Sequence, residues 1–344
     1  LYRGAVVRLL TRVGLMLLLM LQISCATKSV PPDRTVELPA DDAFIDGQYI
    51  QWWYWNGNFT SENGLRFGFQ MVFFSIQPNL MMAHVSLTDI TNRTFQYETV
   101  TRLMIPKKAL KSFDLAAGSV KPMTAKGGAG VDRLTAVVGD FSYDLSLKAS
   151  KPPLVHYGGV AHEYKIGGYT YYYSRPKMEV DGYIVVDGTE LKVTGEAWFD
   201  RQFGDLEEII DTGWQWFSIR LSDNTQLALF YFEEPKAAGE TLLVKYDAEG
   251  NIKNYASDEF DLKVLSTWLS DETGCKYPIE WQLEVEDQSL TIVPYLKDQE
   301  VRPKAGARLT PTYWEGAAVV TGEVVDGEAY VELHGFCDSS VNRP

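Results

Sequence analysis

From about residue 44 onward, apolar and polar residues alternate along short stretches, and this period of two most constrains the fold. In residues 65–73, every second position is large and apolar: Leu65, Phe67, Phe69, Met71 and Phe73. Similar alternation, rich in β-branched and aromatic residues, recurs at residues 191–199, 226–232 and 330–336. Successive side chains of a strand point to opposite faces, so this pattern indicates half-buried β-strands.

Turn signals separate these stretches at short intervals. They are Asn56-Gly57, Asn63-Gly64, Asp187-Gly188, Glu249-Gly250-Asn251 and Asp326-Gly327. Such pairs favour tight turns between antiparallel strands. Only residues 107–113 and 205–210 are candidates for short helices. Many short strands joined by regular turns predict an all-β protein built from sandwiches or barrels.

A diverged internal repeat predicts two related domains. The pair Trp53 and Trp55 is followed ten residues later by a strand, and Trp214 and Trp216 are followed at the same interval by another. Each half also closes with an Asp-Gly hairpin. Meander proteins share such hairpins by chance, but two matches in the same order favour duplication.

The length fits this plan, since 344 residues are enough for two domains of ordinary size. We expect the N-terminal domain to span residues 44–207 and the C-terminal domain residues 208–338. The boundary should fall between Gly204 and Gly213.

The charge of the chain excludes one class of partner. The formal net charge is -14, with 46 acidic residues against 32 basic ones, and no run of five basic residues occurs. Nucleic acids bind to clustered Lys and Arg, so no nucleic-acid partner is expected. The acidity is explained by solubility alone.

The N-terminal residues have the pattern of an export signal. Arg3, Arg8 and Arg12 precede an apolar run at residues 13–23, which is shorter than the roughly 20 residues that cross a bilayer. The run leads into Ser24 and Cys25, as in a bacterial lipobox. We therefore expect a signal peptide over residues 1–24 and lipidation at Cys25. Ordinary cleavage and a retained anchor are the alternatives.

Residues 25–43 would then form a polar, proline-bearing tether between the lipid and the folded part. This predicts a lipoprotein of the bacterial cell envelope, anchored at the periplasmic face and, in a Gram-negative host, favouring the outer membrane because Ala26 follows the cysteine. Beyond Cys25, only Cys275 and Cys337 remain. An exported compartment permits a disulfide between them, and two buried free thiols are the alternative.

An ordered set of aromatic motifs carries a resemblance to a known family. In the first half these are QWWYWNG at 51–57, GFQMVFF at 68–74, AHVSLTD at 83–89, YYYS at 171–174 and GEAWFD at 195–200. In the second half they are GWQWF at 213–217, KYP at 276–278, YWEG at 313–316 and YVEL at 330–333. The set resembles the carotenoid hydratases (hydroxyneurosporene synthases) and AttH-type proteins, often labelled "predicted secreted hydrolase", over about residues 44–337.

This resemblance implies two lipocalin-like antiparallel β-barrels in tandem, an architecture that fungal Diels–Alder cyclases share. Several chemistries therefore use one scaffold. The family segment usually reads Gly-x-Ala-Trp-x-Asp-His-x-Trp. Here Asp200 is present, but Arg201 replaces the His and Phe203 replaces the second Trp. Hydratase chemistry would use a carboxylic acid to protonate an alkene beside aromatic faces, and the missing His puts that specific activity in doubt.

Asp200 is the first catalytic candidate. On a strand it shares a face with Glu196 and Trp198. If that face looks into the barrel, burial beside Trp198 raises the pKa of Asp200, which suits a general acid. The alternative is a salt bridge with Arg201 or another base at the barrel rim.

Three further catalytic candidates are His84, Tyr172 and Arg201. His84 and Tyr172 could carry a proton or orient a ligand, and Arg201 could orient one; packing is the alternative for His84 and for the tyrosines of residues 171–173. Candidate ligand-binding residues are Trp53, Trp55, Gln70, Trp198, Trp214, Trp216, Tyr313 and Glu315. These tryptophans, together with Trp52, would line an apolar pocket inside a barrel. The alternative is that Trp53 and Trp214 plug the barrel ends.

Familiar catalytic motifs are missing from the sequence. It contains no Gly-x-Ser-x-Gly nucleophile elbow and no phosphate-binding loop, and residues 127–130 read as a plain loop. The histidines lack partners at metal-ligand spacing, so neither a metal nor a cofactor is expected.

Three classes of function follow. The first is a cofactor-independent enzyme that hydrates, cyclises or isomerises a hydrophobic, isoprenoid-like substrate. The second is a lipoprotein that binds or carries a lipid-like molecule, linked to an ABC export system. The third is a structural envelope protein with plugged barrels. The tryptophan-rich strands favour the first two.

Overall fold

The computed structural model of the protein describes residues 30–76, 80–103, 109–207, 212–232, 238–303 and 311–337. The predicted signal peptide and Cys25 lie outside the described residues. The described part of residues 107–113 is not helical, because residues 109–112 form a bend and a strand begins at Phe113. In residues 205–210, Asp205 is the end of a strand and residues 208–210 lie outside the described part.

The first antiparallel sheet spans Ile50 to Asp205. Its strands are β1 (Ile50–Ser61), β2 (Arg66–Ile76), β3 (Leu80–Asp89), β4 (Thr94–Leu103), β5 (Phe113–Ala117), β6 (Met123–Gly128), β7 (Val131–Val138), β8 (Phe141–Ala149), β9 (Leu154–Val155), β10 (His162–Glu163), β11 (Tyr169–Val186) and β12 (Thr189–Asp205). The order is β4-β3-β2-β1-β12-β11-β8-β7-β6-β5, with β9 and β10 pairing to β11. Two short 3-10 turns belong to this half, η1 (Ala40–Asp42) and η2 (His156–Gly159).

The second antiparallel sheet spans Trp214 to His334. Its strands are β13 (Trp214–Leu221), β14 (Gln226–Phe232), β15 (Leu242–Tyr246), β16 (Ile252–Tyr255), β17 (Phe260–Leu269), β18 (Lys276–Val285), β19 (Gln288–Pro294), β20 (Glu300–Val301), β21 (Tyr313–Gly322) and β22 (Gly327–His334). The order is β16-β15-β14-β13-β22-β21-β19-β18-β17, with β20 pairing to β21. The turn η3 (Ala238–Glu240) joins β14 to β15.

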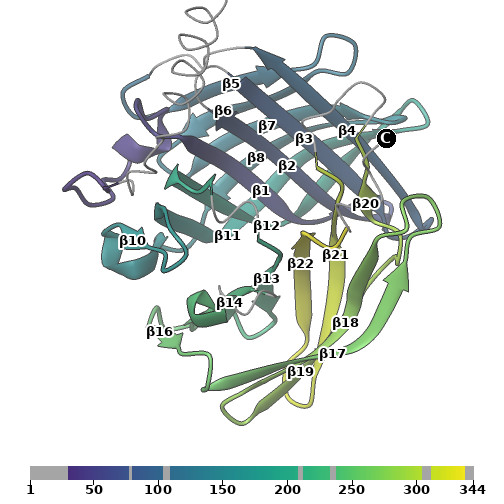
Figure 1. The fold of residues 1–344 in the computed structure, drawn as a ribbon. Coiled ribbons are helices and arrows are strands. Elements are labelled where there is room, and N and C mark those ends of the chain that lie inside the picture. The colour runs from purple at the N-terminus through teal and green to yellow at the C-terminus, as the bar shows by residue number, and fades with distance from the viewer. Residues whose placement is uncertain are drawn as a thin grey trace, which may run out of the picture. The chain divides into compact units, whose positions relative to one another are not determined.

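The two sheets repeat one topology. In each, four strands form a meander, and the last hairpin of the sheet returns beside the first strand of that meander. Figure 1 shows both as curled runs of antiparallel strands. The predicted class is confirmed: the protein is all-β, with two tandem lipocalin-like barrels.

Each barrel is filled by its own inward-facing residues. In the first, Trp53, Trp55 and Phe59 of β1 meet alternate residues of the neighbouring strands in a closed apolar core. The second barrel has a separate core, which includes Phe217 and Trp281. The alternation seen in the sequence therefore places every second side chain inside a barrel and the rest outside it.

The predicted alignment of the two halves is wrong by one residue. The backbone N–H of Ser61 donates to Leu65 at the first hairpin, and that of Leu221 donates to Thr225 at the equivalent hairpin. Leu65 thus corresponds to Thr225, one position before the strand β14 begins. A shift of one residue exchanges the two faces of a strand, so Trp214 and Trp216 do not share the orientation of Trp53 and Trp55.

The barrels dock through their outer walls, and both belong to one compact unit, Pro31–Pro344. The walls approach so closely at Gly68 of β2 that a Cβ atom there would lie 2.4 Å from the Cβ of Ala317 on β21. Polar pairs cross the same interface: Ser218 donates to Asn56 at 2.8 Å, and the hydroxyls of Ser86 and Tyr330 lie 3.1 Å apart. This docking creates the site described below.

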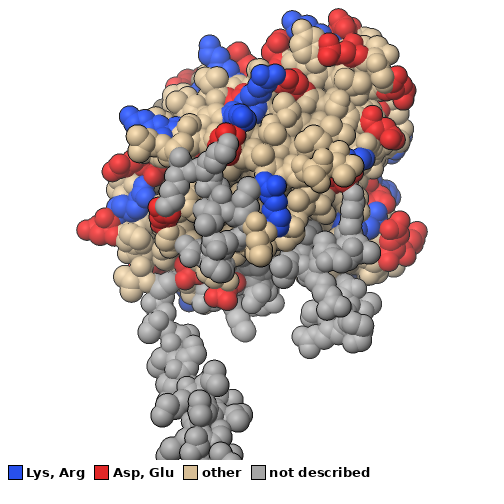
Figure 2. All heavy atoms as spheres, turned by 90° about the horizontal axis from the view of Figure 1, so that it is seen from above, with Lys and Arg blue, Asp and Glu red and all other residues tan. Residues whose placement is uncertain are grey.

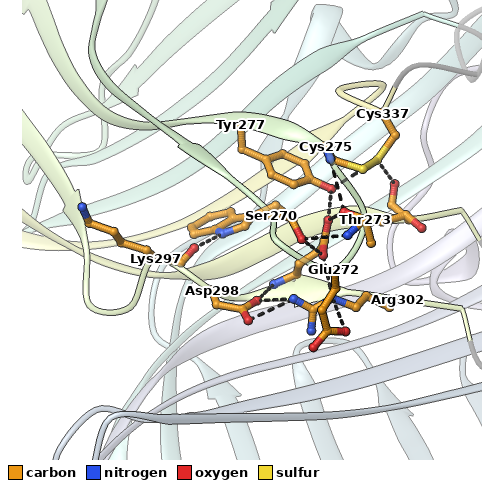
Figure 3. A network of polar contacts seen from close by, with 12 residues as sticks. Ser270, Glu272, Thr273, Cys275, Tyr277, Lys297, Asp298, Arg302 and Cys337 are labelled. Carbon is orange, nitrogen blue, oxygen red and sulfur yellow. Dashed lines mark hydrogen bonds and ion pairs between the residues drawn. A yellow bond between two sulfur atoms is a disulfide. The ribbon is translucent and has the colours of Figure 1, made fainter. Parts of the chain in front are cut away.

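A disulfide joins Cys275 to Cys337 across 62 residues and ties the end of the second sheet to the start of β18. Figure 3 shows it beside a polar network that includes Ser270, Thr273 and Tyr277. The buried Glu300 accepts a hydrogen bond from each of these three side chains. Among the described residues, none of the helices has the length and apolar character needed to cross a bilayer. On the face shown in Figure 2, acidic and basic side chains are interspersed.

Candidate functional site

A pocket of about 420 Å³ lies between the outer walls of the two barrels. Volumes of 300–1,000 Å³ are typical of sites for small organic ligands. Its walls come from β1, β2, β3, β11 and β12 of the first barrel and from β13, β14, β21 and β22 of the second. The site therefore belongs to neither barrel alone.

The strand register arranges the first wall in rows. The outermost row consists of Ile50 and Ile76, the next of Gln202, Trp52, Phe74 and Met82, and the third of Asp200, Tyr54, Val72 and His84. A fourth row, of Trp198, Asn56, Gln70 and Ser86, lies below the pocket. The contacts of Asn56 and Ser86 with the second barrel seal the floor at this row. The pocket thus passes from an aliphatic and aromatic entrance to an acidic end.

The second wall follows the same gradient. Its outer members are Pro311, which is exposed, with Trp214 and His334. A deeper row consists of Glu315, Glu332, Trp216 and Phe230. Carboxyl groups therefore project from both walls at the same depth, among aromatic rings.

Asp200 lies in a pocket wall and is 3% exposed. Three side chains donate to its carboxyl: Ser174 to Oδ1 at 2.5 Å, Trp198 to Oδ1 at 2.7 Å and Tyr172 to Oδ2 at 2.9 Å. Burial raises the pKa of Asp200 to about 7, although these hydrogen bonds act in the opposite direction. Asp200 can therefore hold and release a proton near neutral pH.

Glu315 and Glu332 face each other across β21 and β22. Glu315 accepts a short hydrogen bond from Tyr54 of the first barrel, and Trp214 donates to Glu332 at 3.1 Å. Burial, together with the charge of Glu332, raises the pKa of Glu315 well above its ordinary value. Burial also raises the pKa of Glu332 to about 7, with the charge of Asp200 adding to the effect.

His84 is a neutral member of the same wall. Its Nδ1 lies 2.9 Å from the hydroxyl of Tyr313, and this contact joins the two barrels. Its Nε2 has no hydrogen-bond partner among the described residues. Burial lowers the pKa of His84 to about 4. A neutral imidazole with one unpaired nitrogen can bind a hydroxyl or carbonyl group of a ligand.

Two interpretations of Asp200 that the sequence left open do not hold. Asp200 faces the other barrel rather than the interior of its own, where Ala197 and Phe199 lie instead. It forms no salt bridge with Arg201, because adjacent residues of a strand point to opposite faces. The predicted burial is present, but the second barrel supplies it.

Arg201 is a structural residue outside the pocket. Its guanidinium lies 4.0 Å from the centre of the Trp53 ring and donates to the carbonyls of Asp41 and Ala43 at 3.1 and 2.8 Å. These contacts tie β12 to the η1 segment at the end of the first barrel. The expected orienting role of Arg201 is therefore not supported by its position.

The other predicted ligand-binding residues divide between pocket and core. Tyr172, Trp214, Trp216, Tyr313 and Glu315 line the pocket, as do Asp200 and His84. Trp53 and Trp55 lie in the closed core of the first barrel, so their predicted role as pocket walls is wrong. Trp198 and Gln70 are buried in the row below the pocket.

Sequence reasoning missed Glu332 and Tyr54 as pocket residues, whereas Trp52, one of the tryptophans expected to line a pocket, does line it. The signal for Glu332 was present, since residues 329–334 place Tyr330, Glu332 and His334 on one face of an otherwise apolar strand. For Tyr54, no local signal distinguishes the outer wall of a barrel from its core.

Among the described residues, only Cys275, Glu300 and Cys337 are close enough to one another to hold a metal ion as a group of His, Cys, Asp or Glu. The two sulfur atoms are bonded to each other, so neither is a thiolate ligand. The pocket chemistry rests on carboxyl, hydroxyl, indole and imidazole groups.

Fold and site together define a class: a tandem lipocalin-like protein with one acidic, aromatic pocket between its barrels. The AttH-like family model matches residues 29–336. The chain belongs to the AttH-like family, which confirms the resemblance found in the sequence.

Solved structures support this assignment. A candidate AttH from Nitrosomonas europaea has 26% identity and a TM-score of 0.78, covering 89% of this chain and 99% of its own. Kievitone hydratase from Nectria haematococca has 17% identity and a TM-score of 0.71, covering 90% and 96%. CghA, solved with Sch210972, has 10% identity and a TM-score of 0.53, covering 89% and 97%. The last two show the shared fold alone. A comparison with curated proteins gives no match.

The position of Arg201 generates a prediction about stability. Arg201→Met should lower the free energy of unfolding by about 2–4 kcal/mol, because it leaves buried carbonyls without donors. Arg201→Lys should recover part of the loss. Urea denaturation measures the effect, and ligand affinity of the folded variant should stay unchanged. Wild-type stability of Arg201→Met would contradict the structural role.

Proposed function

We propose that the protein binds a hydrophobic, isoprenoid-like molecule in the pocket between the barrels and protonates one of its alkenes through Asp200. The reaction would be a cofactor-independent hydration, cyclisation or isomerisation. One observation carries the proposal: a buried carboxyl whose pKa is about 7 lies in an aromatic pocket. A general acid works best when its pKa is near the working pH.

The chemistry can be followed atom by atom. The O–H bond of protonated Asp200 breaks as its proton forms a C–H bond with one alkene carbon, leaving a carbocation on the other. Trp216, Trp214 and Trp52 line the pocket, and their aromatic rings would stabilise that positive charge. In hydration, water forms the C–O bond and gives its extra proton to a carboxylate. In isomerisation, a neighbouring C–H bond breaks instead and returns the proton to Asp200.

Glu332 is the residue best suited to accept the proton from water. Its pKa is also about 7, so an ionised Glu332 can coexist with a protonated Asp200. The charge coupling between the two carboxyls favours such a state, because it disfavours two negative charges in one buried site. His84 would orient a polar group of the substrate through its unpaired Nε2.

A non-catalytic carrier is the second candidate function. The apolar entrance formed by Ile50, Trp52 and Phe74 suits retention of a lipid-like molecule whether or not it reacts. In both proposals the protein acts at the bacterial cell envelope, where a lipid on Cys25 would hold it on the membrane. A carrier would act there beside an export system.

Asp200→Asn should abolish proton transfer and spare binding. We would incubate the protein with geraniol, farnesol or geranylgeraniol in D₂O and measure deuterium incorporation into carbon by mass spectrometry. Loss of a general acid should reduce the rate by roughly 10²–10⁴-fold. The matched control is Asp132→Asn, since burial raises the pKa of Asp132 to about 6 but its carboxyl bonds Trp55 inside the first barrel.

The outcomes separate the two functions. Incorporation by wild type and Asp132→Asn but not by Asp200→Asn supports the enzyme. Binding of these alcohols without incorporation by any variant supports the carrier. Equal incorporation by Asp200→Asn and wild type would contradict Asp200 as the acid.

The pH dependence should reveal whether water is added. Because Asp200 acts when protonated, the rate should fall as the pH rises through about 7. Hydration also needs ionised Glu332, so its rate should fall as the pH drops below about 7 and give a bell-shaped profile. Glu332→Gln should remove the acidic limb along with most of the hydration. An increasing rate up to pH 9 would contradict general-acid catalysis.

The lipid anchor has its own test. Cys25→Ser should abolish incorporation of labelled palmitate in the host and release the protein from the membrane fraction. Cys275→Ser, which removes a cysteine of the folded part, should remain labelled. Labelling of Cys25→Ser at the wild-type level would contradict the anchor.

A further inference from the structure

His156 lies behind Asp200 in a turn with unusual backbone geometry. In η2, Tyr157 has φ 54° and ψ 26°, followed by Gly158 and Gly159 with positive φ. A bulky residue in the left-handed region is uncommon and requires surrounding structure to hold it. The turn places the His156 ring parallel to that of Tyr172, with 3.9 Å between ring centres, and leaves His156 only 3% exposed.

A directed chain of hydrogen bonds links His156 to Asp200. Nε2 of His156 lies 2.9 Å from Oγ of Ser174, and Oγ lies 2.5 Å from Oδ1 of Asp200. A serine hydroxyl has one proton to donate. If that proton points to Asp200, Ser174 must accept from His156, so Nε2 of His156 carries the hydrogen. Nδ1 has no partner among the described residues, so no competing bond favours the other tautomer.

The two oxygens of Asp200 consequently differ. Oδ1 accepts from Ser174 and from Trp198, whose indole N–H can only donate. Oδ2 meets the hydroxyl of Tyr172, which can also accept and which lies 3.3 Å from the Trp216 indole nitrogen. Tyr172 and Trp216 line the pocket, whereas Ser174, Trp198 and His156 do not.

We infer that His156 is a positioning residue for Asp200. By donating to Ser174, His156 keeps the Ser174 hydroxyl proton directed at Oδ1 of Asp200. The transferable proton of Asp200 is then left on Oδ2, toward the pocket. The catalytic consequence rests on the proposed function, but the arrangement of protons does not. His156 itself stays neutral, because burial lowers its pKa to about 3.

The surroundings of Asp200 define the variants needed. Ser174 and Tyr172 face it from β11, Trp198 from its own strand and Tyr54 from β1. From the second barrel, Glu332 acts on it through charge. Glu332→Gln therefore serves as a background in which Asp200 titrates without that neighbour.

The experiment is a pH titration of the protonated Asp200 carboxyl by infrared difference spectroscopy. The protein carries ¹³C-labelled aspartate, and the Asp200 band is identified by its loss in Asp200→Asn. Variants are His156→Phe, which keeps a flat ring against Tyr172 but cannot donate, Ser174→Ala, and His156→Gln, whose amide can donate to Ser174. Each is prepared in the wild-type and Glu332→Gln backgrounds, and unfolding curves show which variants remain folded.

A hydrogen bond to a carboxylate favours the ionised form, so losing it raises the pKa. We expect the midpoint of Asp200 to rise by about one pH unit in His156→Phe and in Ser174→Ala, and to stay near wild type in His156→Gln. A double variant that combines His156→Phe with Ser174→Ala should shift the Asp200 midpoint no further than Ser174→Ala does alone, because His156 acts through Ser174. Deuterium incorporation should fall about tenfold in His156→Phe, a fraction of the whole general-acid effect.

Two results would overturn the inference: an unshifted Asp200 midpoint in folded His156→Phe, or additive shifts in the double variant. These results are independent of the proposed function. If Asp200→Asn keeps full deuterium incorporation while the midpoints shift as expected, the proposed reaction fails and the positioning role stands. If Asp200→Asn is inactive but His156→Phe titrates like wild type, only the positioning role fails.

Discussion

The docking of the two barrel walls is the contact on which the site depends, because it buries Asp200 and Glu315 and partly buries Glu332 at one depth. Isolated buried carboxylates are costly, so such groups hold protons at pH values where exposed ones are ionised. The donors around Asp200 fix its geometry without cancelling that effect. The burial that comes with docking of the two walls therefore also raises the pKa values of these carboxyl groups.

The alternation of side chains along a strand explains why adjacent residues have different roles. Asp200 faces the pocket, while Arg201 closes the end of the first barrel over Trp53. The sequence was sufficient to predict the strands, the two-barrel plan and the burial of Asp200. It was insufficient to decide which face of β12 looks into the barrel, because both faces are buried from Ala197 to Gly204 and Arg201 interrupts the apolar pattern of the inner face.

The other differences between prediction and structure come from how strands and distant segments pair. The tryptophan pairs of the two halves match at one spacing, yet the hairpin hydrogen bonds of Ser61 and Leu221 set a register one residue away. Glu332 and His156 reach Asp200 only through long-range pairing, from β22 and from a turn before β11. No local pattern encodes such proximity. The pattern of residue types was enough to predict the fold, but tertiary contacts determine which side chains lie together in the site.

Gly68, pressed against Ala317, shows how closely one half is fitted to the other. Duplication of a barrel would ordinarily provide two cavities that could diverge separately. Here the halves contribute opposite walls of a single cavity, so neither can change its specificity alone. Within this family the two barrels should be inherited and recombined as a pair, and a chimaera that joins barrels from distant relatives would retain two folds but no matched site between them.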